Sequence, residues 1–167
     1  MGAKRTYNVN NVTPTATADT TDLVDSTYVG FFKGGSGTQR TKFNEIYMGG
    51  LAAASAPTLM QLARSSTVHT GTPGGGTDAA DNPETAALAA PVLVGNTAST
   101  LKPQRSSTLK LLNLAFNAFG GIVRWVAREG DEPAIVGNTA SLGEATLSAF
   151  TGGTPGAMGS HVKYETA

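Results

Sequence analysis

The sequence contains no cysteine, no long apolar run and few charged side chains. The absence of cysteine excludes disulfide bonds and metal sites built from thiolates. No apolar run reaches the roughly 18 residues that a membrane-spanning helix requires, so we expect no contact with a membrane. The polar residues 1–7 do not resemble the apolar core of a signal peptide, which predicts synthesis in a cytoplasm.

Charge is the second scarce feature. Charged residues make up 14% of the 167 residues and the formal net charge is zero, whereas about 25% is typical of soluble domains. A free monomer usually needs a charged surface to remain dispersed. The composition therefore favours a surface that neighbouring molecules cover, with a secreted domain solubilised by Ser, Thr and Asn as the alternative. A neutral chain also lacks the basic footprint of a nucleic-acid coat, so we expect no direct binding of nucleic acid.

Residues that carry catalysis are few and scattered. The two histidines, His69 and His161, are predicted to be exposed polar residues of a loop and of the last strand. No nucleophile elbow and no phosphate-binding glycine motif occurs. Glu129, Asp131 and Glu132 could bind a hard cation, but a solvated hairpin tip is the preferred interpretation of this acidic turn. We therefore expect no enzymatic activity, no catalytic residues, no cofactor and no metal.

Glycine, alanine and threonine are abundant, and this composition favours strands and tight turns over long helices. Short segments of alternating apolar and polar residues follow one another between glycine-rich turns. They predict an all-β fold, an antiparallel sandwich of the jelly-roll type. The predicted strands are residues 23–33, 41–51, 91–95, 108–118, 122–128, 134–136, 144–150 and 161–165.

The alternation also predicts which side chains face the core, because successive side chains of a strand point to opposite faces. In the segment 41–51, Phe43, Glu45 and Tyr47 are predicted to share one face, and Asn44 and Ile46 the other. The inward residues predicted for the later strands are Leu112, Leu114, Phe116, Ala118, Ala145, Leu147, Ala149, Val162 and Tyr164. Val123, Trp125 and Ala127 are predicted to share one face of their strand.

Three segments depart from this strand pattern. A short helix is predicted from Ser55 to Arg64, with Ser55 as its cap and Pro57 in its first turn; an Ala-rich edge strand is the alternative. Residues 70–86 are predicted to be an irregular loop, because three consecutive glycines disfavour regular structure. The sequence VGNTAS occurs at 94–99 and again at 136–141, and both copies are predicted to leave a strand through the same turn.

Residues 1–22 are polar and rich in threonine. We predict that they form an extended N-terminal arm, and that residues 23–167 form the sandwich domain. The arm suits a strand added to another chain's sheet, and a disordered tail is the alternative. Tyr7, Val9 and Val12 are its predicted partner-interface residues.

A second predicted interface lies in the C-terminal half. Arg124 and Arg128 share one face of their predicted strand, beside Trp125. Arg and Trp are favoured residues at binding hot spots, so we assign the two arginines to a partner interface. In the alternative interpretation, Trp125 belongs to the core and the arginines are ordinary surface residues.

The Thr-rich arm, the Ala/Gly/Thr bias and the segments 115–127 and 153–165 resemble accessory capsid proteins of tailed bacteriophages, the decoration or cement class. This resemblance implies a small β domain on the outer surface of the virion. It further implies a homotrimer or another homo-oligomer whose partner is the major capsid protein. The alternatives are a phage tail, fibre or receptor-binding module, and a self-assembling coat protein.

Overall fold

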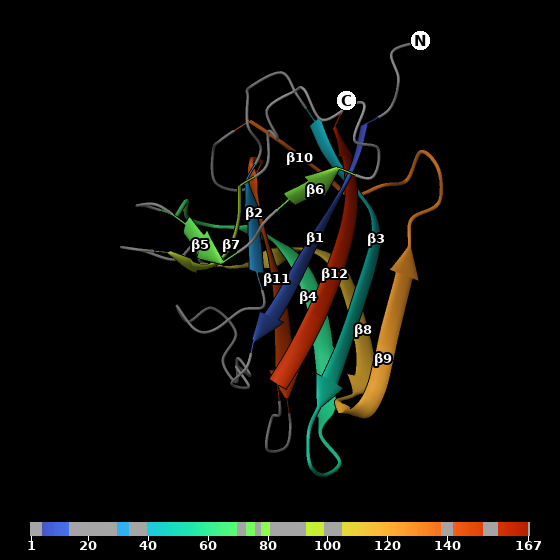
Figure 1. The fold of residues 1–167 in the computed structure, drawn as a ribbon. Coiled ribbons are helices and arrows are strands. Elements are labelled where there is room, and N and C mark those ends of the chain that lie inside the picture. The colour runs from blue at the N-terminus through green and yellow to red at the C-terminus, as the bar shows by residue number, and fades with distance from the viewer. Residues whose placement is uncertain are drawn as a thin grey trace.

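The computed structural model describes residues 5–13, 30–33, 40–69, 73–75, 78–80, 93–98, 105–137, 142–151 and 157–166. These residues form two antiparallel β-sheets and no helix (Figure 1), so the prediction of an all-β fold is confirmed. The strands are β1 (Arg5–Thr13), β2 (Gly30–Lys33), β3 (Arg40–Leu51), β4 (Pro57–Ser65), β5 (Pro73–Gly75), β6 (Asp78–Ala80), β7 (Leu93–Ala98), β8 (Arg105–Asn117), β9 (Phe119–Val126), β10 (Ala134–Val136), β11 (Glu144–Thr151) and β12 (Ala157–Thr166).

The strands divide into two sheets that face each other. Sheet A has the order β10-β3-β12-β1-β6, and β9 also pairs with β3. Sheet B has the order β5-β7-β2-β11-β4-β8. In Figure 1, β1, β12 and β3 lie in front of β11, β4 and β8.

Eight of the strands follow the order of a jelly roll. Without β5, β6, β7 and β10, sheet A reads β1-β12-β3-β9 and sheet B reads β2-β11-β4-β8. Among these eight strands, the chain crosses from one sheet to the other between β1 and β2, β2 and β3, β3 and β4, β8 and β9, β9 and β11, and β11 and β12. Two four-stranded antiparallel sheets connected in this way make the jelly-roll sandwich that the sequence predicts.

The core lies between the two sheets. Phe32 of β2 meets Phe43 of β3 edge to face, with ring centroids 5.0 Å apart, and this contact joins sheet B to sheet A. Each large apolar side chain buried in this way stabilises the fold by about 1.5–3 kcal/mol. The fully buried apolar side chains of this core are Phe32, Phe43, Ile46, Met48, Ala56, Met60, Leu62, Ile135, Ala145, Leu147, Ala149, Val162 and Tyr164.

A bulge at Asn44 changes the predicted facing of β3. Tyr164 pairs with Phe43 and the preceding Lys163 pairs with Glu45, so Asn44 is an extra residue in β3. Beyond the bulge the alternation is shifted by one residue: Phe43 and Ile46 are both buried, whereas Glu45 faces outward. The prediction that Phe43 and Glu45 share a face is therefore wrong.

The helix predicted from Ser55 to Arg64 is also wrong, because β4 (Pro57–Ser65) occupies this segment. β4 lies inside sheet B and pairs with β11 on one side and with β8 on the other. It is therefore not an edge strand either. Proline is tolerated at the first residue of a strand, and the two neighbouring strands satisfy the backbone that a helix would otherwise have satisfied internally.

The connections β3–β4 and β8–β9 cross between the sheets side by side, at the lower end of Figure 1. Ala118, buried between them, accepts a hydrogen bond from Ala52 N (3.0 Å) and donates one to Ala56 O (2.9 Å). The Asn117 side chain accepts hydrogen bonds from the backbone N–H groups of Ala56 (2.9 Å) and Phe119 (3.0 Å). This corner fixes where β9 starts relative to β4.

The predicted irregular loop 70–86 contains two short strands, so this prediction is wrong for β5 and β6. β5 pairs with β7 and β6 pairs with β1. Pairing with the edge of an existing strand orders each of these short segments, even though two of the three residues of β5 are glycines. The two copies of VGNTAS also differ: residues 94–98 lie inside β7, whereas the second copy leaves β10 at Gly137 with φ 76°.

Part of the predicted arm belongs to the sandwich. β1 pairs along its whole length with β12 of the same chain, and residues 7–9 also pair with β6. Residues 14–22 of the arm lie outside the described residues. The domain boundary between residues 22 and 23 stays a prediction.

Candidate interface on sheet A

β9 forms an open side of the molecule together with β8. Among the described residues, β9 pairs only with β3, and β8 pairs only with β4. Figure 1 shows β9 at the right-hand edge of sheet A with β8 behind it. The two unpaired strand edges therefore lie on the same side of the sandwich, which we call the open edge.

Large apolar side chains gather on the outer surface of β9 and on the end of β3. Leu51 is 79% exposed, Phe119 58%, Ile122 68% and Val126 53%. These four, which we call the apolar strip, are half of the eight large apolar residues exposed in the described part of the chain. The pairing of Leu51 with Phe119 makes the strip continuous across the two strands. Clustered exposed apolar residues mark interaction sites, whereas scattered ones need no explanation.

One ion pair lies within the apolar strip. Arg124 Nε donates a 2.6 Å hydrogen bond to Glu45 Oε1, and the guanidinium lies 5.3 Å from the centre of the Tyr47 ring. The Arg124 side chain is 58% exposed and that of Glu45 17%. The pair therefore adds little to stability, but it neutralises both charges at the centre of an apolar surface.

The contacts around this ion pair change the pKa values of Glu45 and Tyr47. Partial burial alone would raise the pKa of Glu45, but hydrogen bonds from Arg124 and Tyr47 and the charges of Arg124 and Lys163 hold it below its ordinary value of 4.5. The pKa of Tyr47 is raised, first by its hydrogen bond to Glu45 and then by desolvation. At neutral pH, Glu45 is therefore charged and Tyr47 is protonated.

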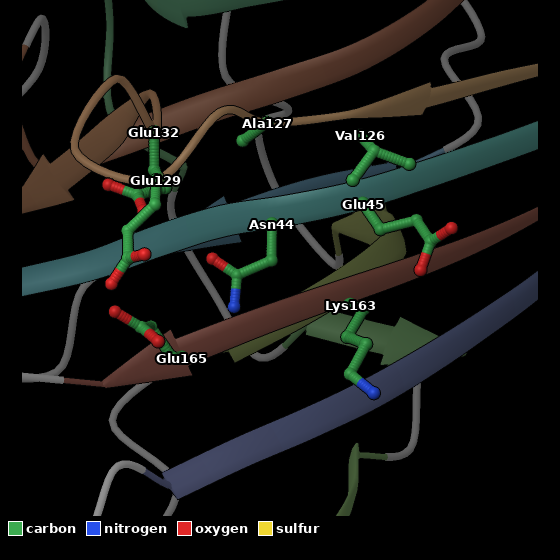
Figure 2. Close-up of a pocket in the computed structure, with 8 residues that line it drawn as sticks. All are labelled: Asn44, Glu45, Val126, Ala127, Glu129, Glu132, Lys163 and Glu165. Carbon is green, nitrogen blue, oxygen red and sulfur yellow. The ribbon is translucent and has the colours of Figure 1, made fainter.

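An acidic hollow of about 280 Å³ adjoins the strip at Val126. Figure 2 shows Asn44 at its centre, between Glu129 and Glu165 on one side and Glu45 and Lys163 on the other. Its lining residues are Asn44, Glu45, Val126, Ala127, Glu129, Glu132, Lys163 and Glu165.

The carboxylates of the hollow are partly neutralised. Lys42 Nζ lies 3.7 Å from Glu132 Oε2 and 3.5 Å from Glu165 Oε1. Glu132 also accepts a hydrogen bond from Gly130 N at 3.0 Å. Within the described ranges, no three acidic or histidine side chains are placed to hold a metal ion.

The inner face of the open edge is only partly covered. Val123 and Trp125 point inward and pack against the core, yet both keep part of their surface exposed. The inward side chains of β8 do the same: Leu111, Leu112, Leu114 and Phe116. Trp125 is thus a core residue at the margin of the core, as the alternative interpretation of the sequence states.

The structure places one of the five predicted interface residues beside the apolar strip. Arg124 lies between Ile122 and Val126 on β9, whereas the exposed Arg128 lies beyond the end of β9. Tyr7, Val9 and Val12 lie in β1, which β12 and β3 separate from β9; their side chains lie outside the described part. A role for any of the five in binding a partner stays a prediction.

The two histidines lie in different surroundings. The prediction that His69 is exposed is wrong: it is 7% exposed and its Nδ1 lies 2.6 Å from Glu144 Oε1. Glu144 also accepts a hydrogen bond from His69 N at 3.0 Å, and the imidazole packs 5.0 Å from the Phe31 ring. His161 is half-buried within β12, with its ring 5.8 Å from that of Tyr47. Neither histidine lines the acidic hollow.

No helix in the described part of the chain is long and apolar enough to cross a membrane. In the comparison with protein families, no family model matches the chain. None of the curated proteins matches the sequence either. The interpretation of the site therefore depends on its geometry and chemistry.

Proposed function

We propose that this chain is a structural protein of a virus particle, a decoration protein that binds the outside of a capsid and stabilises the shell. Its partner is the major capsid protein, and the chain acts as a homotrimer or another homo-oligomer. The single observation that carries this proposal is the apolar strip on an unpaired strand edge of a charge-poor jelly roll. A surface of this kind gains free energy when another protein covers it.

Three further features support a mechanical role. The core is filled by close-packed side chains from both sheets, so the sandwich can transmit force without deforming. Arg124 and Glu45 within the strip already neutralise each other, so an apolar partner that covers the strip does not have to bury an unpaired charge. Copies repeated around a shell would add many weak contacts, and avidity then replaces a single tight site.

The alternatives differ in chemistry. A coat that packages a genome alone would need a basic inner surface, whereas this chain has no net charge. A receptor-binding module would present exposed aromatic residues on loops; Phe119 of the strip is the most exposed aromatic of the described residues and lies on a strand. The decoration function therefore fits the exposed surface better than either alternative.

Cosedimentation with capsids tests the proposal. Purified chain is mixed with capsids of the virus that encodes it, stripped of this protein, and binding is followed to saturation. We expect stoichiometric binding and a higher temperature of capsid disruption than for bare capsids. A chain that stays in the supernatant contradicts the proposal, and closed shells formed by the chain alone would identify a coat protein instead.

A further inference from the structure

We infer that β9 is a self-association edge: two copies of the chain pair antiparallel through β9 about a two-fold axis and join their A sheets. This inference deepens the proposed function, since it rests on the same apolar strip and names one occupant of it. The occupant is a second copy of this chain.

The backbone of β9 is suited to adding a strand. β9 is eight residues long and, among the described residues, bonds only to β3. Its other edge therefore carries the outward-facing N–H and C=O groups that template further pairing. Sheet edges that must stay unpaired are normally short, bulged, or protected by proline, lysine or inward charges. β9 contains no proline and no lysine, and Arg124, its only charged residue, points outward. The irregularity of β9 lies at Gly120 and Gly121, before the regularly paired residues 122–126.

Both faces of an added strand would be covered. On the outer face it would meet Ile122 and Val126 of the strip, and on the inner face the partly exposed Val123 and Trp125. The strand would thus bury apolar surface on each side while it satisfies the free backbone groups. Cross-strand apolar pairs each contribute a few tenths to about 1 kcal/mol in addition to the backbone pairing.

The charges favour a second copy over a strongly charged partner. The strip carries one cation, Arg124, and one anion, Glu45, which already balance each other. Two copies related by a two-fold axis present the same neutral surface to each other, because each Arg124 is already paired with Glu45 of its own chain. Because the whole chain has zero net charge, two copies do not repel each other at long range.

The sequence of β9 also selects a register. An axis through Arg124 would place two guanidinium groups opposite each other, which is unfavourable. An axis through Val123 places Val123 opposite its own copy, and Ile122 opposite Arg124 of the second copy. The same register sets Trp125 opposite Gly121, so that the large ring covers a residue without a side chain. We therefore place the axis at Val123.

The absence of cysteine allows a direct test. In single-cysteine variants, Val123→Cys would lie next to its own copy, whereas Val126→Cys would be roughly 20 Å from its copy at the rise of a strand. Mild oxidation should therefore link Val123→Cys into covalent dimers in preference to Val126→Cys. Val126 is the more exposed of the two, so random collisions would give the opposite order. Equal linking of both variants, or a preference for Val126→Cys, overturns the inference.

Sedimentation equilibrium without capsids gives the second measurement. We expect the unmodified chain to dimerise, and Ile122→Lys, which sets a lysine opposite Arg124, to weaken the dimer about tenfold or more. Leu142→Lys is the matched control, because Leu142 is 55% exposed but lies outside β9, and it should leave the dimer unchanged. Circular dichroism confirms that both variants fold.

The two proposals fail separately. A dimer that does not bind capsids supports the self-association edge and contradicts the decoration function. A chain that stays monomeric, but loses capsid binding in Ile122→Lys, overturns the second copy as occupant and assigns the edge to a strand of the capsid protein.

Discussion

The strands β3, β12, β11 and β4 bury their inward apolar side chains completely, whereas β8 and β9 leave part of theirs exposed. Leu62 of β4 is fully buried, but its cross-strand partner Leu112 of β8 is only partly buried. Both residues belong to the same sheet and have the same side chain. The difference therefore comes from position. The strands β3, β12, β11 and β4, which we call the closed side, are covered by other parts of their own chain, whereas β8 and β9 at the open edge are covered only in part.

Two close pairs of side chains, each joining a nitrogen to a glutamate oxygen, repeat this contrast. His69–Glu144 and Arg124–Glu45 both have an N–O distance of 2.6 Å. The side chains of the first pair are 4% and 0% exposed, and those of the second 58% and 17%. Equal geometry thus has unequal consequences, because a buried charge left without its partner is costly and an exposed one is not. The comparison teaches that the buried pair can contribute strongly to stability, whereas the exposed pair of the open edge contributes little.

The largest effect is expected from breaking the buried pair. In His69→Ala, the buried Glu144 side chain loses the imidazole and keeps only the hydrogen bond from the backbone N of residue 69, and we expect a loss of about 3–5 kcal/mol in the free energy of unfolding. Urea denaturation measures this loss. Arg124→Ala is the control from the open edge and should cost far less. If both variants lose the same free energy of unfolding, the buried pair is no more important for stability than the exposed one.

A smaller effect separates the two cross-strand leucines. Leu62→Ala leaves a cavity in the sealed part of the core and should destabilise the fold by about 3 kcal/mol or more. Leu112→Ala removes the same atoms where solvent already reaches, and we expect roughly half of that cost. Both values come from chemical denaturation under one set of conditions. If Leu112→Ala proves as costly as Leu62→Ala, β8 belongs to the sealed side and the open edge is confined to β9.

The smallest expected effect is the loss of Glu45's contribution to stability at acidic pH. The pKa of Glu45 lies below 4.5 in the folded chain, mainly through Arg124 acting against partial burial. Its contribution to stability is therefore present above pH 4.5 and is lost as the pH falls through the lowered value. Glu45→Gln should be slightly less stable than the unmodified chain at neutral pH, and the difference should vanish in acid. A difference that grows as the pH falls would contradict this assignment.

The sequence predicted well those strands that keep a single regular alternation. Ala145, Leu147 and Ala149 of β11, and Val162 and Tyr164 of β12, are buried as expected. The bounds of β10 agree with the predicted segment 134–136. In these strands one face packs on the core, so apolar residues occupy every second position of the sequence.

The failures have identifiable physical causes. The alternation of β3 changes phase at Asn44, and only the pairing with β12 reveals a bulge there. β4 has an Ala- and Leu-containing sequence that is compatible with a helix, but its two neighbouring strands override that local preference. The burial of His69 depends on Glu144, which is 75 residues away in the sequence. No local signal could have paired these two residues.

The outward position of Arg124 was predicted, but the apolar strip was not. Leu51 and Phe119 become neighbours only because β3 pairs with β9. From the sequence alone, Leu51 ended the predicted strand 41–51, whereas Phe119 lay between the predicted strands 108–118 and 122–128. The candidate site therefore exists only because the fold pairs β3 with β9. The sequence alone could identify its residues singly but could not show that they are neighbours.

The place of β12 between β1 and β3 has a consequence for biosynthesis. Arg5 pairs with Thr166, so sheet A joins segments that are separated by almost the entire described chain. A growing polypeptide holds β1 and β3 without the strand that connects them until β12 leaves the ribosome. Pairing over such separations is slow to form and exposes unpaired strands in the meantime. Nascent chains should therefore depend on chaperones until this strand is inserted.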